Sequence, residues 1–272
     1  MKQFFNIFVA IFVTFSIGCS KSSRGDAAVS AMPSWIGATV SFLENERRYI
    51  GDSITLSPYY FLRLHLLSEA RRCFSDKGRH VTLSGTPQQV LQLMSRHGAL
   101  TENAYHPRHG GLSHAVLARK VETAVRSSRT EAEALQRAAD VVDEEIDYLP
   151  RMVFLFGAEY TPLEYAHSIA LESDYRWIDH EPQGGWTVLL LQAGHAVWYG
   201  TLPHSLRKAH IAADDHGMVA LEIVGVSPDD GCAINFTTTD TSSTGSTIPT
   251  EWIEKHTRGV LLNPNPSSDR RK

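Results

Sequence analysis

The chain has 272 residues, a length that allows one large domain or two compact lobes. Hydrophobic residues make up 42% and charged residues 21%, so the chain can bury a substantial core, and this composition does not fit whole-chain disorder. The formal net charge of −4 gives no indication of a basic, nucleic-acid-binding surface. Three cysteines without a CxxC pair exclude a disulfide scaffold and a thiolate zinc site; they are Cys19, Cys73 and Cys232.

The first residues predict export and lipid attachment. One lysine, a short apolar run over residues 4–13 and small residues before Cys19 are typical of a signal peptide over residues 1–18. Cys19 directly after Ile-Gly resembles a bacterial lipobox, although Ser16 departs from the usual leucine. An ordinary signal peptide or an uncleaved anchor is the alternative. We therefore expect Cys19 to be lipidated in the bacterial cell envelope, facing the periplasm or the exterior, and residues 19–30 to form a tether.

Helices are predicted in the first part of the chain. Residues 34–50 show helical spacing of apolar side chains, with Ser34 at or near the N-cap and the charged residues 44 and 46–48 on the outside. A serine and a proline open a second helix, and Gly98 ends a third. A long Ala-, Glu- and Arg-rich run is interpreted as a solvated helical face. These further helical segments are residues 57–72, 86–97 and 112–149.

Strands are predicted in the last third, where apolar runs are bounded by turn residues. The predicted strands are residues 186–191, 195–199, 219–226, 232–236 and 260–262. Helices first and strands later favour an α+β fold with segregated lobes over alternating βαβ units. Residues 264–272 are polar and are expected to form a disordered tail.

Short blocks along the chain carry a resemblance. They begin with Ser-Trp-Ile-Gly-Ala at 34–38 and end with Asp-His-Gly-Met at 215–218 followed by Val-Gly-Val at 224–226; between them lie 42–46, 56–60, 69–71, 85–105, 160–166 and 194–198. In this order they resemble the papain-like cysteine peptidases, in particular the bleomycin hydrolase/aminopeptidase C branch, which has Cys-Trp-Ser-Phe-Ala in the first block. The resemblance implies a papain-like α+β fold over residues 31–263, with a helical N-terminal lobe and a β-rich C-terminal lobe around a cleft.

The resemblance also implies a set of catalytic positions. A papain-type site needs a thiolate at a helix N-terminus, a histidine base, an asparagine that orients the histidine, and a glutamine that donates to the oxyanion. Ser34 occupies the nucleophile position, His216 the base position and Asn235 the orienting position. No glutamine lies between Cys19 and Ser34. A serine hydroxyl lacks the low pKa of the thiol, and losing an oxyanion donor costs roughly 10²–10³ in turnover.

These departures favour a catalytically inactive, lipid-anchored relative that binds a peptide or protein ligand in its cleft. The alternative is an active peptidase or esterase with Ser34 as nucleophile, His216 as general base and Asn235 as orienting residue. A third hypothesis is a structural envelope protein without a working cleft. By themselves, Ser34 is interpreted as a helix cap and Asn235 as a turn residue.

Two further groups of residues bear on cofactors. The histidines at 106, 109 and 114 have no cysteine or acidic partner at metal-site spacing, so they are interpreted as loop residues, and no metal or other cofactor is expected. Cys73 and Cys232 lie in opposite halves of the chain. An oxidising compartment would allow them to pair, but two isolated buried thiols are the simpler interpretation.

Overall fold

The structure, a computed structural model, describes residues 32–108, 111–155, 157–169, 175–179, 184–204, 206, 213–227, 233–237 and 246–264. The predicted signal peptide, its tether, Cys19, Cys232 and nearly all of the predicted tail lie outside these residues, so the expectations for them stay predictions. Within the described ranges, no helix is long and apolar enough to cross a membrane.

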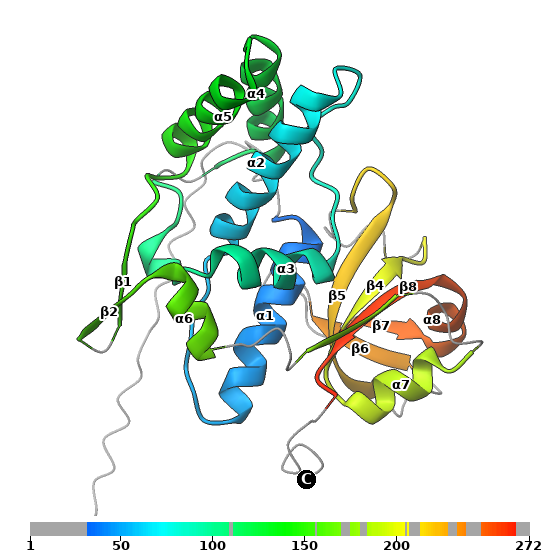
Figure 1. The fold of residues 1–272 in the computed structure, drawn as a ribbon. Helices are drawn as coiled ribbons and strands as arrows, with labels where there is room; N and C mark the ends of the chain where they lie inside the picture. The colour runs from blue at the N-terminus through cyan, green and yellow to red at the C-terminus, as the bar shows by residue number, and fades with distance from the viewer. Residues whose placement is uncertain are drawn as a thin grey trace, which may run out of the picture.

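A helical lobe is formed by the first half of the chain (Figure 1). Its helices are α1 (Ser34–Tyr49), α2 (Pro58–Ser75), α3 (Pro87–His97), the short 3₁₀ turn η1 (Glu102–Ala104), α4 (His114–Arg126) and α5 (Glu131–Glu145). The helix ends follow local chemistry. The Ser57 hydroxyl accepts a hydrogen bond from the Tyr60 amide at the start of α2, and Thr86 and Gln89 form a capping box at the start of α3. The predicted helices at 34–50, 57–72 and 86–97 are confirmed.

The run at 112–149 forms a helical hairpin instead of a solvated face. Thr130 caps α5 by accepting a hydrogen bond from the Glu133 amide, which marks where the second helix begins. Each helix buries a stripe with four-residue spacing, and the hairpin packs on α2. The two stripes consist of Leu117, Val121 and Val125 on α4, and Ala134, Ala138 and Val142 on α5. The charged residues between these stripes account for the interpretation of the run as a solvated face.

The second lobe is an antiparallel six-stranded sheet in the order β3-β8-β4-β5-β6-β7 (Figure 1). Its elements are β3 (Arg176–Asp179), α7 (Trp186–Ala193), β4 (Ala196–Thr201), β5 (Met218–Ser227), β6 (Ala233–Thr237), β7 (Ser246–Pro249), α8 (Thr250–His256) and β8 (Thr257–Leu262). A hairpin and one helix connect the lobes: β1 (Val153–Leu155), β2 (Ala158–Tyr160) and α6 (Pro162–Ile169). Segregated helices and strands confirm the α+β class.

The predicted strand at 186–191 is wrong, because this segment is the helix α7. The carboxylate of Glu254 accepts hydrogen bonds from the backbone amides of residues 185–187, which satisfies the donors that a helix start leaves free. Gly194 ends the helix with φ of +69°, a left-handed conformation that glycine adopts without strain. The continuous apolar run has no period that would distinguish a helix from a strand.

The two faces of the sheet belong to different cores. Alternate residues of β4, β5 and β8 pack into the core of the helical lobe, namely Val197, Ala220 and Leu261. Their chain neighbours pack on the opposite face with α7 and α8, namely Trp198, Leu221 and Val260. This period-two alternation places α1 directly against β5 and β4 on the helix-facing side. Residues on that side with the same parity, His195 and Glu222, therefore face the helical lobe.

Candidate functional site

The implied nucleophile position lies where α1 begins against β5. Ser34 is the first residue of α1, directly after the cap residue Pro33, so its expected place at or near the N-cap is confirmed, but the interpretation that its side chain caps the helix is wrong. The Ser34 Oγ instead accepts a hydrogen bond from the backbone amide of Ala220 at 3.0 Å. In the described part of the chain, β6 pairs with β5 only from Glu222 onward. The first residues of β5 are thus left for the start of α1 to contact.

A loop before α3 forms one side of this site. The Trp35 indole Nε1 donates to the carbonyl oxygen of Leu83 at 2.9 Å. Gly85 lies directly on the same ring, because a Cβ at this position would come within 2.5 Å of Trp35 Cε2. The Ser84 hydroxyl lies 3.5 Å from the Asp215 carboxylate, at the limit of a hydrogen bond. Trp35 therefore fixes the loop beside Ser34, and this loop lies next to the turn that precedes β5.

The implied base, His216, lies in that turn. The Asp214 carboxylate accepts hydrogen bonds from the backbone amides of His216 at 2.9 Å and Met218 at 2.8 Å, and these bonds shape the turn. The His216 side chain is exposed. Both His216 and Ser34 are described, and no hydrogen bond joins them. The structure brings the two residues to the same end of the α1–β5 contact without forming a nucleophile–base pair.

Asn235 lies elsewhere in the sheet. The register of β5 and β6 places it opposite Gly225, and it pairs with Thr247 on its other side. At about 3.3 Å per residue, Gly225 is roughly 23 Å along β5 from Met218, the residue where the strand leaves the His216 turn. The structure therefore separates Asn235 from His216. Asn235 also lies inside β6, so its interpretation as a turn residue is wrong.

Comparisons with known proteins give a likeness at the level of the fold. No family model matches the chain, and no curated protein matches it. Among solved structures, the chain is similar to the crystal structure of PepW from Lactobacillus rhamnosis HN001 (DR20), determined as the selenomethionine derivative. The TM-score is 0.58 at 11% sequence identity, over 89% of this chain and 81% of that chain. The chain has a peptidase-like α+β fold.

Within this peptidase-like fold, a buried ionisable cluster lies behind the candidate site. Glu46 of α1, His195 before β4 and Glu222 of β5 are 3%, 3% and 1% exposed. The sequence analysis placed Glu46 on the outer side of its helix, which is wrong, because Glu46 is buried against His195, a residue far away in the chain. His195 and Glu222 gave no catalytic or metal-site pattern. Only the fold shows that the three side chains meet.

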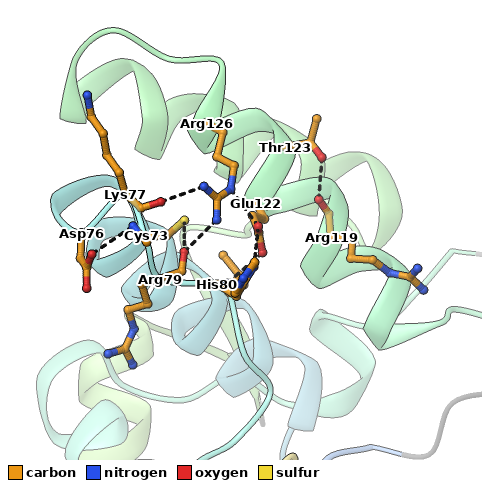
Figure 2. A network of polar contacts seen from close by, with 11 residues as sticks. Cys73, Asp76, Lys77, Arg79, His80, Arg119, Glu122, Thr123 and Arg126 are labelled. Carbon is orange, nitrogen blue, oxygen red and sulfur yellow. Dashed lines mark hydrogen bonds and ion pairs between the residues drawn. The ribbon is translucent and has the colours of Figure 1, made fainter.

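Cys73 does not have the properties of a catalytic nucleophile. It is a free, buried thiol whose Sγ donates to the carbonyl oxygen of Arg79 at 3.2 Å (Figure 2). Burial raises the pKa of the Cys73 thiol and so disfavours the reactive thiolate. Arg126 of α4 closes the same loop by donating to the carbonyl oxygens of Lys77 and Arg79. The network in Figure 2 therefore secures the loop after α2 against α4.

Metal ligands do not gather in the described residues, because no group of three His, Cys, Asp or Glu side chains there has a geometry that fits a metal ion. His114 opens α4 and is buried, with its ring 6.0 Å from that of Tyr59, so its interpretation as a loop residue is wrong. His109 lies outside the described residues.

Proposed function

We propose that this chain is a binding protein built on a peptidase-like fold, in which the position of the peptidase nucleophile serves as a structural contact. The observation that carries the proposal is the hydrogen bond from the Ala220 amide to the Ser34 Oγ. A serine nucleophile needs a base within hydrogen-bond reach that accepts its proton. Ser34 contacts a backbone amide instead, while His216 is exposed and makes no hydrogen bond to Ser34.

The remaining parts of the site support the same conclusion. Asn235, which the resemblance makes the orienting residue, lies in β6 opposite Gly225, far along β5 from the turn that contains His216. The sequence has no glutamine between Cys19 and Ser34 to donate to an oxyanion. A Ser–His–Asn mechanism would have to operate with its base unoriented and its tetrahedral intermediate without that donor. Binding of a peptide or protein ligand between the lobes does not need any of these groups.

Restoring the thiol tests the proposal directly. We expect Ser34→Cys to hydrolyse neither aminoacyl nor peptide substrates and to react with iodoacetamide at pH 6 no faster than the matched Ser84→Cys variant. Ser84 is the natural control, because it is half-buried in the neighbouring loop and outside the implied catalytic set. An activated thiolate at position 34 would react at least about tenfold faster than the control thiol.

The active-hydrolase alternative makes an opposite prediction for the unmodified chain. It requires a serine-directed phosphonate to label the wild-type protein and requires Ser34→Ala to abolish that labelling. Either this result or peptidase activity of Ser34→Cys would overturn the binding proposal. Absence of both, with a folded protein confirmed by circular dichroism, would support it.

We also propose that Cys19 carries the lipid anchor. The apolar run at 4–13 followed by Ile-Gly-Cys19 supports it. Expressed with its leader in a bacterial host, the chain should incorporate labelled palmitate, and Cys19→Ala should abolish incorporation. Cys73→Ser is the matched control and should retain the label, because Cys73 is buried in the folded domain. Label that persists in Cys19→Ala would contradict the anchor.

A further inference from the structure

The contact between the two lobes contains a buried acid–histidine–acid cluster. The His195 Nδ1 lies 2.8 Å from a carboxylate oxygen of Glu46, and its Nε2 lies 2.6 Å from a carboxylate oxygen of Glu222. Glu46 belongs to α1, whereas His195 and Glu222 belong to the sheet lobe. The cluster therefore joins the lobes through side chains that are almost fully removed from water.

The geometry indicates the protonation state of the imidazole. A neutral imidazole has one N–H donor, and its second nitrogen only accepts. Ionised carboxylates only accept. Both ring nitrogens of His195 lie at hydrogen-bond distance from carboxylates, so both contacts form together when the ring carries two protons. The positive imidazolium then lies between two negative groups, which is the arrangement that buried charges require.

Other polar groups donate to the same carboxylates. Ser41 and Asn45 of α1 donate to Glu222, and the Asn263 amide donates to Glu46 at 2.8 Å. Asn45 shares the Glu222 oxygen that contacts His195, whereas Ser41 and Asn263 contact the second oxygens of Glu222 and Glu46. The titratable groups that face His195 are Glu46 and Tyr49 from α1, with the Tyr49 ring 5.7 Å away, and Glu222 from β5. Glu44 of α1 acts on Glu222 through space.

The pKa directions agree with this charge state. Burial alone lowers the pKa of His195, but the hydrogen bonds to Glu222 and Glu46 outweigh burial and raise the pKa above its ordinary value. Burial alone raises the pKa of Glu222, but the hydrogen bonds from His195, Ser41 and Asn45 lower it below its ordinary value. Each group thus favours the charged form of its partner.

We propose that protonated His195 forms a pH-sensitive contact that holds α1 against the sheet, and that loss of its proton releases this contact. When the ring is neutral, one carboxylate loses its donor, and two buried negative charges face each other without a cation between them. The released helix is the one whose first residue, Ser34, contacts Ala220 two positions before Glu222 on β5. The charge state of His195 therefore affects how α1 and β5 meet at the candidate site. This effect does not depend on whether that site is catalytic.

The direction of the pH dependence follows from the two pKa shifts. The contribution of His195 is fully present below its unfolded pKa and is lost as the pH rises through its raised folded pKa. The contribution of Glu222 is present above its unfolded pKa and is lost as the pH falls through its lowered folded pKa. The lobe contact is therefore tightest between these limits and opens on the alkaline side by deprotonation of His195.

Nitrogen-15 NMR of the histidine rings in the full chain tests the charge state. We expect both His195 nitrogens to carry protons at pH 7, with a titration midpoint above that of a free histidine peptide. Hydrogen exchange tests the release. After correction for intrinsic rates, the protection of α1 and of the Ala220 amide should fall by about tenfold or more across the His195 titration, while the α4–α5 hairpin stays protected.

Variants distinguish the loss of the His195 contact from general alkaline unfolding. Glu46→Gln/Glu222→Gln removes both charges and lets a neutral imidazole donate to one amide and accept from the other, so the alkaline loss of protection should disappear. His204→Gln changes an exposed histidine outside the cluster and should keep the wild-type profile. A singly protonated His195 at pH 7, or the same alkaline loss in the double variant, would overturn the proposal. If the double variant does not fold, the wild-type NMR and exchange measurements decide.

Discussion

Gly98→Ala is expected to lower the free energy of unfolding by about 3 kcal/mol or more, a large part of the stability of an ordinary domain. Gly98 ends α3 with φ of +85°, where a side chain alone costs roughly 1–2 kcal/mol. A Cβ would also lie 2.1 Å from the carbonyl carbon of Pro162. This atom belongs to the backbone at the start of α6. The Ala99 amide donates to the Pro162 oxygen at 2.9 Å, so α6 cannot move away without breaking this bond. Urea unfolding measures the loss.

Gly51→Ala is the matched control, because it separates backbone strain from the steric clash. Gly51 has φ of +90°, and a Cβ there would meet no atom within 4 Å. Its variant should lose only the strain of about 1–2 kcal/mol. Equal losses in the two variants would contradict the close approach of α3 and α6.

Trp35→Ala is expected to lower the free energy of unfolding by about 3–5 kcal/mol, the usual cost of removing a large buried aromatic side chain. The ring is 2% exposed, lies under Gly85 and packs edge-on against His65 at 5.0 Å. The variant also leaves the Leu83 carbonyl oxygen without its indole donor. Because this ring fixes the loop beside Ser34, backbone amides at residues 83–85 should exchange hydrogen faster in the variant than in the wild-type protein.

Trp35→Phe provides the comparison, because it keeps an aromatic ring and removes the indole N–H. We expect a smaller loss of about 1–2 kcal/mol, mainly from the unpaired Leu83 carbonyl. If Trp35→Ala lost less than about 1 kcal/mol in urea unfolding, the packing of the loop on this ring would be contradicted.

The sequence contained the local signals for the helical lobe. Ser57 followed by proline, the Thr86–Gln89 capping box and the positive-φ Gly98 each act within a few residues, so their effect is visible without the fold. The order of the sequence blocks also predicted a peptidase-like fold, and the similarity to the PepW structure supports this fold. The prediction of a strand at 186–191 was wrong. The group that satisfies the amides at the start of its helix is the Glu254 carboxylate, which lies in α8.

The candidate site divides in the same way. Residue type alone determined that position 34 carries a hydroxyl and that the stretch from Cys19 to Ser34 has no glutamine. Only the tertiary structure decided that Ser34 accepts from Ala220, that Asn235 lies opposite Gly225, and that Glu46 is buried beside His195. Strand register and the docking of α1 bring together groups far apart in the chain. No local pattern encodes these distances, because they depend on how both lobes pack.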